Sequence, residues 1–201
     1  MKKNLFLMAF VLIAGKSFSQ TSISLKDSTY IYYNWNVVTN DWDDVMRNQY
    51  SYNSSYKEIS NLTSRIVGTS WQNFENKKNY VYNANHNLLE VTYEKWTGSW
   101  ADDSKDICTY NASGNMLSKL QQYMISGSWI NTYNTLYTYS GGNKMSSLYQ
   151  FWNTTTASWT NMFRTTYTYN TGNQLTEEVN EDWVSGAWKP SIKLTNHIYS
   201  G

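Results

Sequence analysis

Cysteine, proline and histidine are almost missing from this sequence, which has one, one and two of them in 201 residues. Cys108 is the only thiol, so no intramolecular disulfide can form, and burial and backbone pairing must hold the fold together. His86 and His197 are far apart, and no HExxH arrangement, Gly-x-Ser-x-Gly elbow or glycine-rich phosphate loop occurs. We therefore expect no catalytic residue, no metal site and no cofactor.

An excess of charge is also absent. The first twenty residues hold three lysines and no acid, so the remainder carries 13 basic and 15 acidic residues. Without a basic surplus, phosphate backbones and anionic lipids have little to attract them. We therefore expect no nucleic-acid partner.

The N-terminal segment differs from everything that follows it. Lys2 and Lys3 precede an almost purely apolar run at 5–14, and the segment 16–20 that follows contains the small residues Ser17 and Ser19. This order is typical of a secretory signal peptide, and the run is too short to span a membrane. We predict a signal peptide at 1–20, no transmembrane segment in the mature chain, and a location outside the cell or at its surface.

The residues that are abundant indicate strands. Phe, Trp and Tyr make up 17% of the chain, and the mean hydropathy is −0.63. Aromatic residues favour the half-buried surface of a sheet. Tyrosine explains the low hydropathy, since it counts as polar while its ring covers a large area.

Two residue series reveal an internal repeat of about 29 residues. The tryptophan series, spaced 29, 29, 29, 30 and 29 apart, is Trp42, Trp71, Trp100, Trp129, Trp159 and Trp188. The tyrosine series, spaced 30, 28, 29, 30 and 30 apart, is Tyr52, Tyr82, Tyr110, Tyr139, Tyr169 and Tyr199. The chain therefore consists of six units.

Each unit reads as two strands and two tight turns. After Trp159, alternate residues from Phe163 to Tyr169 share a face, turn residues follow at 170–173, and a second strand covers 175–183. Strands joined by such short loops pair antiparallel. We expect an all-β antiparallel meander of about twelve strands from six hairpins, with no helix after the signal peptide.

The meander should form one domain over 21–201, from a first strand near 27–35 to a last one near 190–199. Pro190 suits an edge strand, because proline cannot donate to an inner ladder. Twelve strands exceed what an open sheet usually holds without curling, so we expect a spiral sheet, a shell or a partly open barrel. Residues 197–201 match the start of another turn, as a truncated repeat array would show, and the free edge predicts self-association.

Three turns carry a resemblance to a known family. The stretches YVYNANHNL at 80–88, CTYNASGNM at 108–116 and YTYNTGNQL at 167–175 resemble the YD repeat of secreted bacterial Rhs-type shell proteins. That motif is Tyr-x-Tyr-Asp, a turn, Gly-Asn and Leu; here Asn or Ser replaces the Asp and the period is longer. The resemblance implies an antiparallel spiral sheet with Tyr and Leu stacked between hairpins.

All ten tryptophans lie at the opposite turns, where short polar residues accompany them. They allow two interpretations: rows of rings that stack on sugars, or cross-strand pairs that clamp each hairpin. The candidate glycan-stacking residues are Trp71, Trp96, Trp100, Trp129, Trp152, Trp159, Trp183 and Trp188. Their candidate polar partners are Asn73, Asp102, Asn131 and Asn161. Recurrence in every unit favours the clamp, because a ligand site usually breaks repeat symmetry.

Neighbouring acids such as Asp102 and Asp103 do not form a catalytic or calcium pair, because adjacent strand residues point to opposite faces. We expect an exported, non-enzymatic repeat protein with a structural, adhesive or interaction role at the cell surface. A carbohydrate-binding module is the alternative; a glycan-active enzyme or a fragment of an Rhs-like shell is more distant. The partners expected are glycans, other surface proteins or a second copy.

Overall fold

The computed structural model describes residues 28–195, except for the side chains of residues 42, 44, 45, 74 and 75. The strands are β1 (Ser28–Asn36), β2 (Asp41–Tyr52), β3 (Glu58–Val67), β4 (Ser70–Tyr82), β5 (Leu88–Trp96), β6 (Trp100–Tyr110), β7 (Met116–Ile125), β8 (Ser128–Ser140), β9 (Asn143–Asn153), β10 (Ser158–Tyr169), β11 (Leu175–Val184) and β12 (Ala187–Thr195). Every element within 28–195 is a strand, which confirms the all-β prediction. The predicted signal peptide, 1–20, lies outside the described residues, as do His197 and Tyr199.

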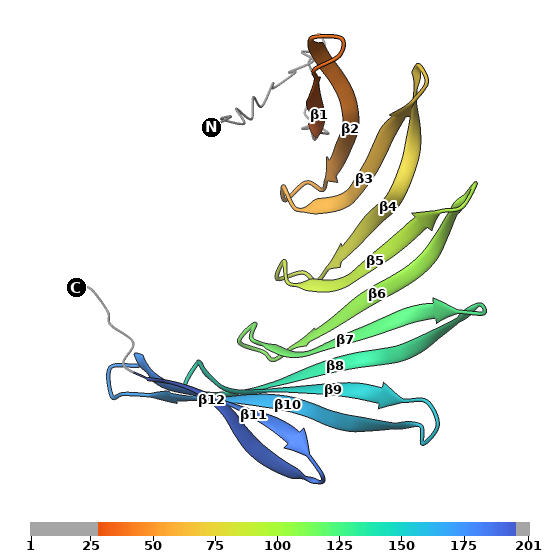
Figure 1. The fold of residues 1–201 in the computed structure, drawn as a ribbon. Coiled ribbons are helices and arrows are strands. Elements are labelled where there is room, and N and C mark those ends of the chain that lie inside the picture. The colour runs from red at the N-terminus through yellow and green to blue at the C-terminus, as the bar shows by residue number, and fades with distance from the viewer. Residues whose placement is uncertain (1–27, 196–201) are drawn as a thin grey trace. The chain divides into compact units, whose positions relative to one another are not determined.

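The twelve strands form one sheet in which spatial order follows chain order from β1 to β12 (Figure 1). The pairings that the structure describes strand by strand are all antiparallel. The predicted meander is therefore confirmed. Because the order is linear, the sheet does not close into a barrel, and β1 and β12 each have one neighbour. Pro190 lies on β12, the edge strand that was expected for it.

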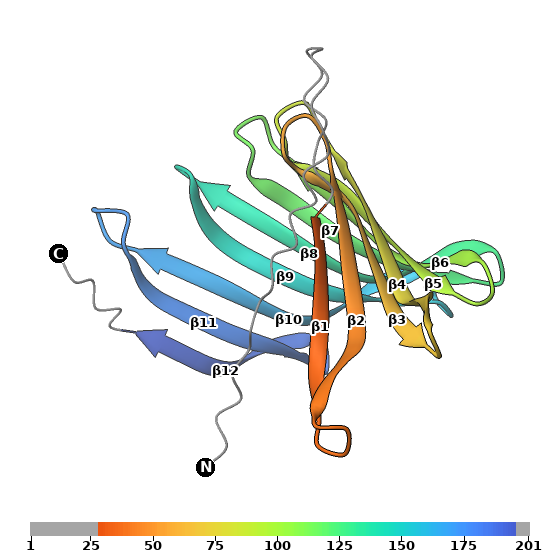
Figure 2. The same cartoon turned by 90° about the horizontal axis from the view of Figure 1, so that it is seen from above.

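The described residues group into two compact units, 28–81 with 91–103 and 82–90 with 104–195. The first contains β1 to β3, β4 up to Val81, most of β5 and the start of β6. The second contains most of β6 and all of β7 to β12. Within the second unit, β8, β9 and β10 run side by side as long strands in both views (Figure 2).

Register places the tryptophans and most tyrosines of the second unit on opposite faces of the sheet. Trp152 lies opposite Trp159 and Trp183 opposite Trp188, on what we call the tryptophan face. On the other side, the tyrosine face, Tyr133 lies opposite Phe151 and Thr135 opposite Tyr149. Alternation of side chains along each strand produces this separation. Each pairing whose register is described has a register shift at a bulge, for example between Asn180 and Glu181.

Few side chains are buried. Among the described residues the buried apolar ones are Val91 and Cys108, and the buried polar ones are Ser64, Asp106 and Thr165. Every described element belongs to the sheet, so the described part of neither unit contains a helix or second sheet that packs on it. Cross-strand side-chain pairs and backbone ladders therefore stabilise each unit internally, in agreement with the low hydropathy.

Four of the turns that join successive hairpin repeats share one asparagine-capped geometry. In the turn after β6, the Oδ1 of Asn111 accepts bonds from the backbone N–H groups of Ser113 and Asn115, at 3.0 and 2.9 Å. Asn53, Asn83 and Asn170 do the same in their turns. An aspartate could accept the same bonds, which explains physically why Asn can stand where the YD motif has Asp.

The fourth residue of each of these turns is left-handed. Gly114 has φ 81°, while Tyr56, His86 and Asn173 have φ 58°, 62° and 60° in the same place. Glycine and asparagine tolerate this conformation, whereas Tyr and His do so at a cost. The turn between β8 and β9 is shorter, with Gly141 and Gly142 at φ 56° and 87°. Its residues therefore follow a different backbone path from the other four.

The tyrosine that ends the Tyr-x-Tyr motif connects successive hairpin repeats. Tyr110 donates its hydroxyl hydrogen to the carbonyl oxygen of Leu88 at 2.9 Å. Tyr169 makes the same bond to the carbonyl oxygen of Lys144. Leu88 is the first residue of β5 and Lys144 the second residue of β9, so each tyrosine anchors its hairpin repeat to the preceding repeat. At these two positions of the tyrosine series, the bond gives the regular spacing a structural role.

Candidate functional site

Three tryptophan pairs close the hairpins at their outer turns. The ring centroids are 5.3 Å apart for Trp96 and Trp100, with the planes inclined at 67°. The pair of Trp152 and Trp159 has 5.1 Å and 67°, and that of Trp183 and Trp188 has 4.8 Å and 64°. These are edge-to-face contacts, which stabilise by electrostatics as well as burial. The rings of one pair therefore do not form a flat platform.

The other two predicted stacking residues have no tryptophan opposite them. Trp71 lies across from Ile66, and Trp129 lies across from Met124. Trp96 is the most exposed of the eight, with 40% of its surface accessible, and the other seven are half-buried. The rings are therefore partly accessible at every one of these turns.

Each of four tryptophans carries a cation that sequence reasoning missed. Arg47 lies over Trp71 with its guanidinium carbon 4.8 Å from the ring centroid, and Arg164 lies 4.6 Å from Trp188. The ammonium groups that complete the series are Lys77, 5.9 Å from Trp100, and Lys105, 4.4 Å from Trp129. Such cation–ring contacts are attractive because the ring face is negative.

A sequence signal for these cations exists. Each lies five or six residues after one marker tryptophan and contacts the marker of the next unit. The hairpin repeat that starts at Trp129 departs from this spacing, because the uncharged Asn134 stands five positions after that tryptophan. The sequence shows the regular spacing of these cations, but it does not show that each one contacts a tryptophan two strands away.

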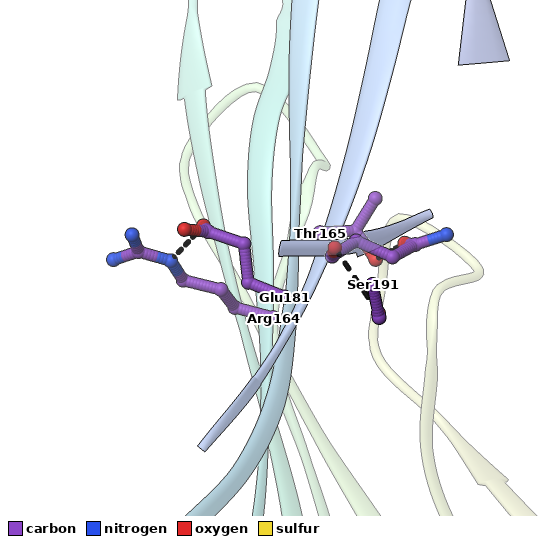
Figure 3. A network of polar contacts seen from close by, with 5 residues as sticks. Arg164, Thr165, Glu181 and Ser191 are labelled. Carbon is purple, nitrogen blue, oxygen red and sulfur yellow. Dashed lines mark hydrogen bonds and ion pairs between the residues drawn. The ribbon is translucent and has the colours of Figure 1, made fainter. Parts of the chain in front are cut away.

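Acids hold two of the cations in place. Lys77 pairs with Glu94 at 2.6 Å, and the side-chain amide of Asn79 donates to the same carboxylate. Figure 3 shows Arg164 joined to Glu181, with Thr165 and Ser191 on the other side of the strands. The hydrogen bond from Arg164 lowers the pKa of the Glu181 carboxyl and is the largest cause of that shift. The pair therefore stays charged well below neutral pH.

The predicted polar partners have their own bonds. Asn131 accepts from the amide of Gln122 at 2.8 Å, and Asn161 accepts from Gln150 at 2.9 Å, each across the strand pair. Asn73 is half-buried opposite Ser64. These amides join neighbouring strands beside the tryptophans.

The two neighbouring acids near the Trp96 turn have different surroundings. Asp102 is exposed, while Asp103 forms an ion pair with Lys95 at 2.7 Å. In the described part of the chain no group of three or more His, Cys, Asp or Glu side chains could hold a metal ion. Burial raises the pKa of the Cys108 thiol, which disfavours the nucleophilic thiolate. No helix among residues 28–195 is both long and apolar enough to cross a membrane.

The tyrosine face carries a row of stacked rings instead of pairs. Tyr149 lies between Tyr133 and Phe163, with centroids 5.3 and 4.7 Å away and planes inclined at 18° in both cases. Lys144 places its ammonium group 4.3 Å from the ring of Tyr167 on the same face. Three strands, β8 to β10, are joined by this row.

No protein-family model matches the chain, and no curated protein matches its sequence. Among solved structures, the fold is similar to that of a Bacteroides fragilis protein of unknown function, with a TM-score of 0.49 and 15% identity over 59% of this chain and 93% of that one. A DUF3836 family protein from Parabacteroides distasonis matches with a TM-score of 0.33 and 18% identity over 42% and 88%. A structure described as TcdB2-TccC3-TEV matches with a TM-score of 0.39 and 14% identity, over 84% of this chain and 12% of that chain.

Proposed function

We propose that this chain is an exported, non-enzymatic repeat protein with a structural or adhesive role at the cell surface or outside the cell. The observation that carries the proposal is the shallow burial of both units, in which only five described residues are buried. Such a sheet offers side chains of both faces to other macromolecules. The signal-like segment 1–20 supports export, and the resemblance to YD repeats supports a role built on repetition.

The use of the polar residues also supports this function. The carboxylates of Glu94 and Glu181 neutralise cations that cover tryptophans, and Asn131 and Asn161 join strands. Groups that could catalyse a reaction thus serve to hold hairpins. An enzyme would instead need several of them to converge around one substrate atom.

The location can be tested in the organism that encodes the protein. The full chain and a variant without residues 2–20 are compared in cell fractions and in the culture medium. We expect the full chain in the medium or at the surface, where external protease removes it, and the variant inside the cell. Protease-resistant full chain in the cytoplasm would refute the proposal. The absence of enzymatic activity is checked by reducing-end release from a panel of polysaccharides.

Carbohydrate binding through the tryptophan face is the second candidate, favoured by the 40% exposure of Trp96. Tryptophan fluorescence is titrated with neutral and acidic polysaccharides, using Trp96→Ala against Trp35→Ala, a tryptophan at the β1–β2 turn that is 47% exposed. A saturable shift that the Trp96 variant loses and the Trp35 variant keeps would establish this site. No shift with any polysaccharide would exclude it and leave the structural role.

A further inference from the structure

Lys193 occupies the position of the cation series on β12, the strand at one edge of the described sheet. Lys193 stands five residues after Trp188, as Arg164 stands five residues after Trp159. Arg164 on β10 lies over Trp188 on β12, two strands further along the sheet. Lys193 lies on β12 itself, which has no following strand in the described sheet.

We propose that β12 of one copy pairs with β1 of a second copy, so that two chains continue one antiparallel sheet head to tail. The strand two places beyond β12 is then β2 of the second copy. The equivalent of Trp188 on that strand is Trp42, the first marker of the repeat. Lys193 would then lie two strands from the backbone position of Trp42 in the second copy, the same separation in strands as between Arg164 and Trp188.

The repeat also sets the register of this contact. In three described pairings, the cation lies opposite the residue two positions before the one that faces the marker tryptophan across the next hairpin turn: Trp183, Met124 or Ile66. Arg164 lies opposite Glu181, Lys105 opposite Gln122, and Arg47 opposite Ser64. On β1 the residue two before Trp35 is Tyr33, so we infer the pair Lys193 and Tyr33. Leu194 then meets Tyr32, and Ile192 meets Asn34.

The two end strands carry the apolar surface that this pairing needs. Ile192 and Leu194 on β12 are 54% and 48% exposed, and Tyr32 and Tyr33 on β1 are 42% and 41% exposed. In the inferred register Leu194 and Tyr32 share a face, as do Lys193 and Tyr33. Pairing would cover these side chains and supply partners for the outer backbone groups of both edge strands.

Neither Pro190 nor the ion pair of Lys193 prevents this strand pairing. Ladders toward the next strand begin four residues after the marker tryptophan, at Phe163 after Trp159. The corresponding residue on β12 is Ile192, so Pro190 lies before the ladder that it would interrupt. Lys193 pairs with Glu177 at 2.6 Å, but that lysine is 59% exposed, and such surface pairs hold a side chain weakly.

Cysteine trapping tests the register. Leu194→Cys and Tyr32→Cys are made as separate variants and mixed under mild oxidation, and Leu194→Cys is mixed with Tyr33→Cys as the control on the other face. We expect a disulfide-linked pair from the first mixture, and little from the control or from wild-type protein, whose Cys108 is buried. A dominant Leu194→Cys homodimer would show β12 paired with β12 and would overturn the proposal.

Sedimentation velocity over a wide concentration range tests the assembly. A head-to-tail contact does not close, so we expect species that grow beyond the dimer as concentration rises. Ile192→Lys should abolish this growth, whereas Val184→Lys, an equally large change at a residue 47% exposed at the β11–β12 turn, should leave it unchanged. Lys193→Ala should weaken association about 2- to 5-fold, because it removes the side chain opposite Tyr33, against no change for Lys189→Ala. A monomer at all concentrations would refute the inference, and so would assembly that the Ile192→Lys variant retains unchanged.

Discussion

The guanidinium of Arg164 covers the ring of Trp188, two strands away, while its Nε donates a hydrogen bond to Glu181. One side chain thus joins β10, β11 and β12. The same arrangement, with Lys77, Glu94 and Trp100, recurs in the first unit. In a sheet with so few buried residues, contacts of this kind take over much of the stabilisation that a core usually supplies.

Removing the cation should therefore destabilise the fold measurably. We expect Arg164→Ala to lower the free energy of unfolding by about 1–2 kcal/mol, since it loses the ring contact and leaves Glu181 unpaired. Arg164→Lys should lose less, because it keeps the charge. Urea unfolding followed by circular dichroism measures both. Lys189→Ala on β12 is the control, and equal losses for Lys189 and Arg164 would contradict the role given to the ring contact.

The Arg164–Glu181 pair also predicts a pH dependence. The hydrogen bond from Arg164 keeps the pKa of the Glu181 carboxyl below its usual value, which is about 4.3. Its stabilisation is therefore complete above that usual value and is lost as the pH falls through the lower, folded-state pKa. The Glu181→Gln variant should lose less stability than wild type between pH 7 and pH 3. Glu178→Gln, which lies on the other face, should follow wild type.

The asparagine caps predict a specific rank of substitutions. Asn111→Ala should destabilise by about 1–2 kcal/mol, because two backbone N–H groups lose their acceptor. Asn111→Asp should be nearly neutral, since a carboxylate oxygen can accept both bonds. Ser113→Ala in the same turn is the control, and thermal melting is the measurement. A loss at Asp as large as at Ala would show that the amide itself is required.

The left-handed tyrosine predicts a stabilising change. Tyr56 has φ 58° and is 72% exposed, so its side chain contributes little packing and strains the turn. We expect Tyr56→Gly to raise the free energy of unfolding by about 0.5–1 kcal/mol. Ser54→Gly in the same turn, where φ is not positive, should be neutral or destabilising. A lower melting temperature for Tyr56→Gly would refute this reading of the turn.

The tryptophan pairs can be tested for a clamp by a double-mutant cycle. Trp152 and Trp159 suit this test, because β8 carries the uncharged Asn134 where other units carry the cation that covers the next marker. With leucine at either or both positions, we expect a coupling energy of about 0.5–1.5 kcal/mol. Additive losses, with no coupling, would mean that the rings do not stabilise each other and are free for another use.

Much of this architecture could be predicted from the sequence, because it depends on local periodicity. The alternation from Phe163 to Tyr169 and the turn residues after them indicated strands and hairpins, and the structure has them at those places. Pro190 indicated an edge strand for the same reason, since the lack of a backbone N–H is a property of the residue alone. The cap at Asn111 and the position of Gly114 likewise follow from short-range backbone geometry.

Contacts between units could not be predicted in the same way. The sequence showed that basic residues follow the marker tryptophans, but not that Lys105 lies over Trp129 or that Tyr110 bonds to the carbonyl of Leu88. These partners stand 22 to 24 residues apart, and only the register of the paired strands brings them together. Shifting that register by one residue would move every such side chain to the opposite face.

The sequence by itself therefore determined the hairpins, their number and the alternation of side chains, because each depends on neighbours along the chain. Only the tertiary structure decided that Trp96 and Trp100 meet edge to face, and that cations from the preceding hairpin cover the marker rings. It also decided that the sheet stays open, with Lys193 on an edge strand. Those outcomes depend on bulges and strand order, whose effects accumulate between residues that are distant along the chain.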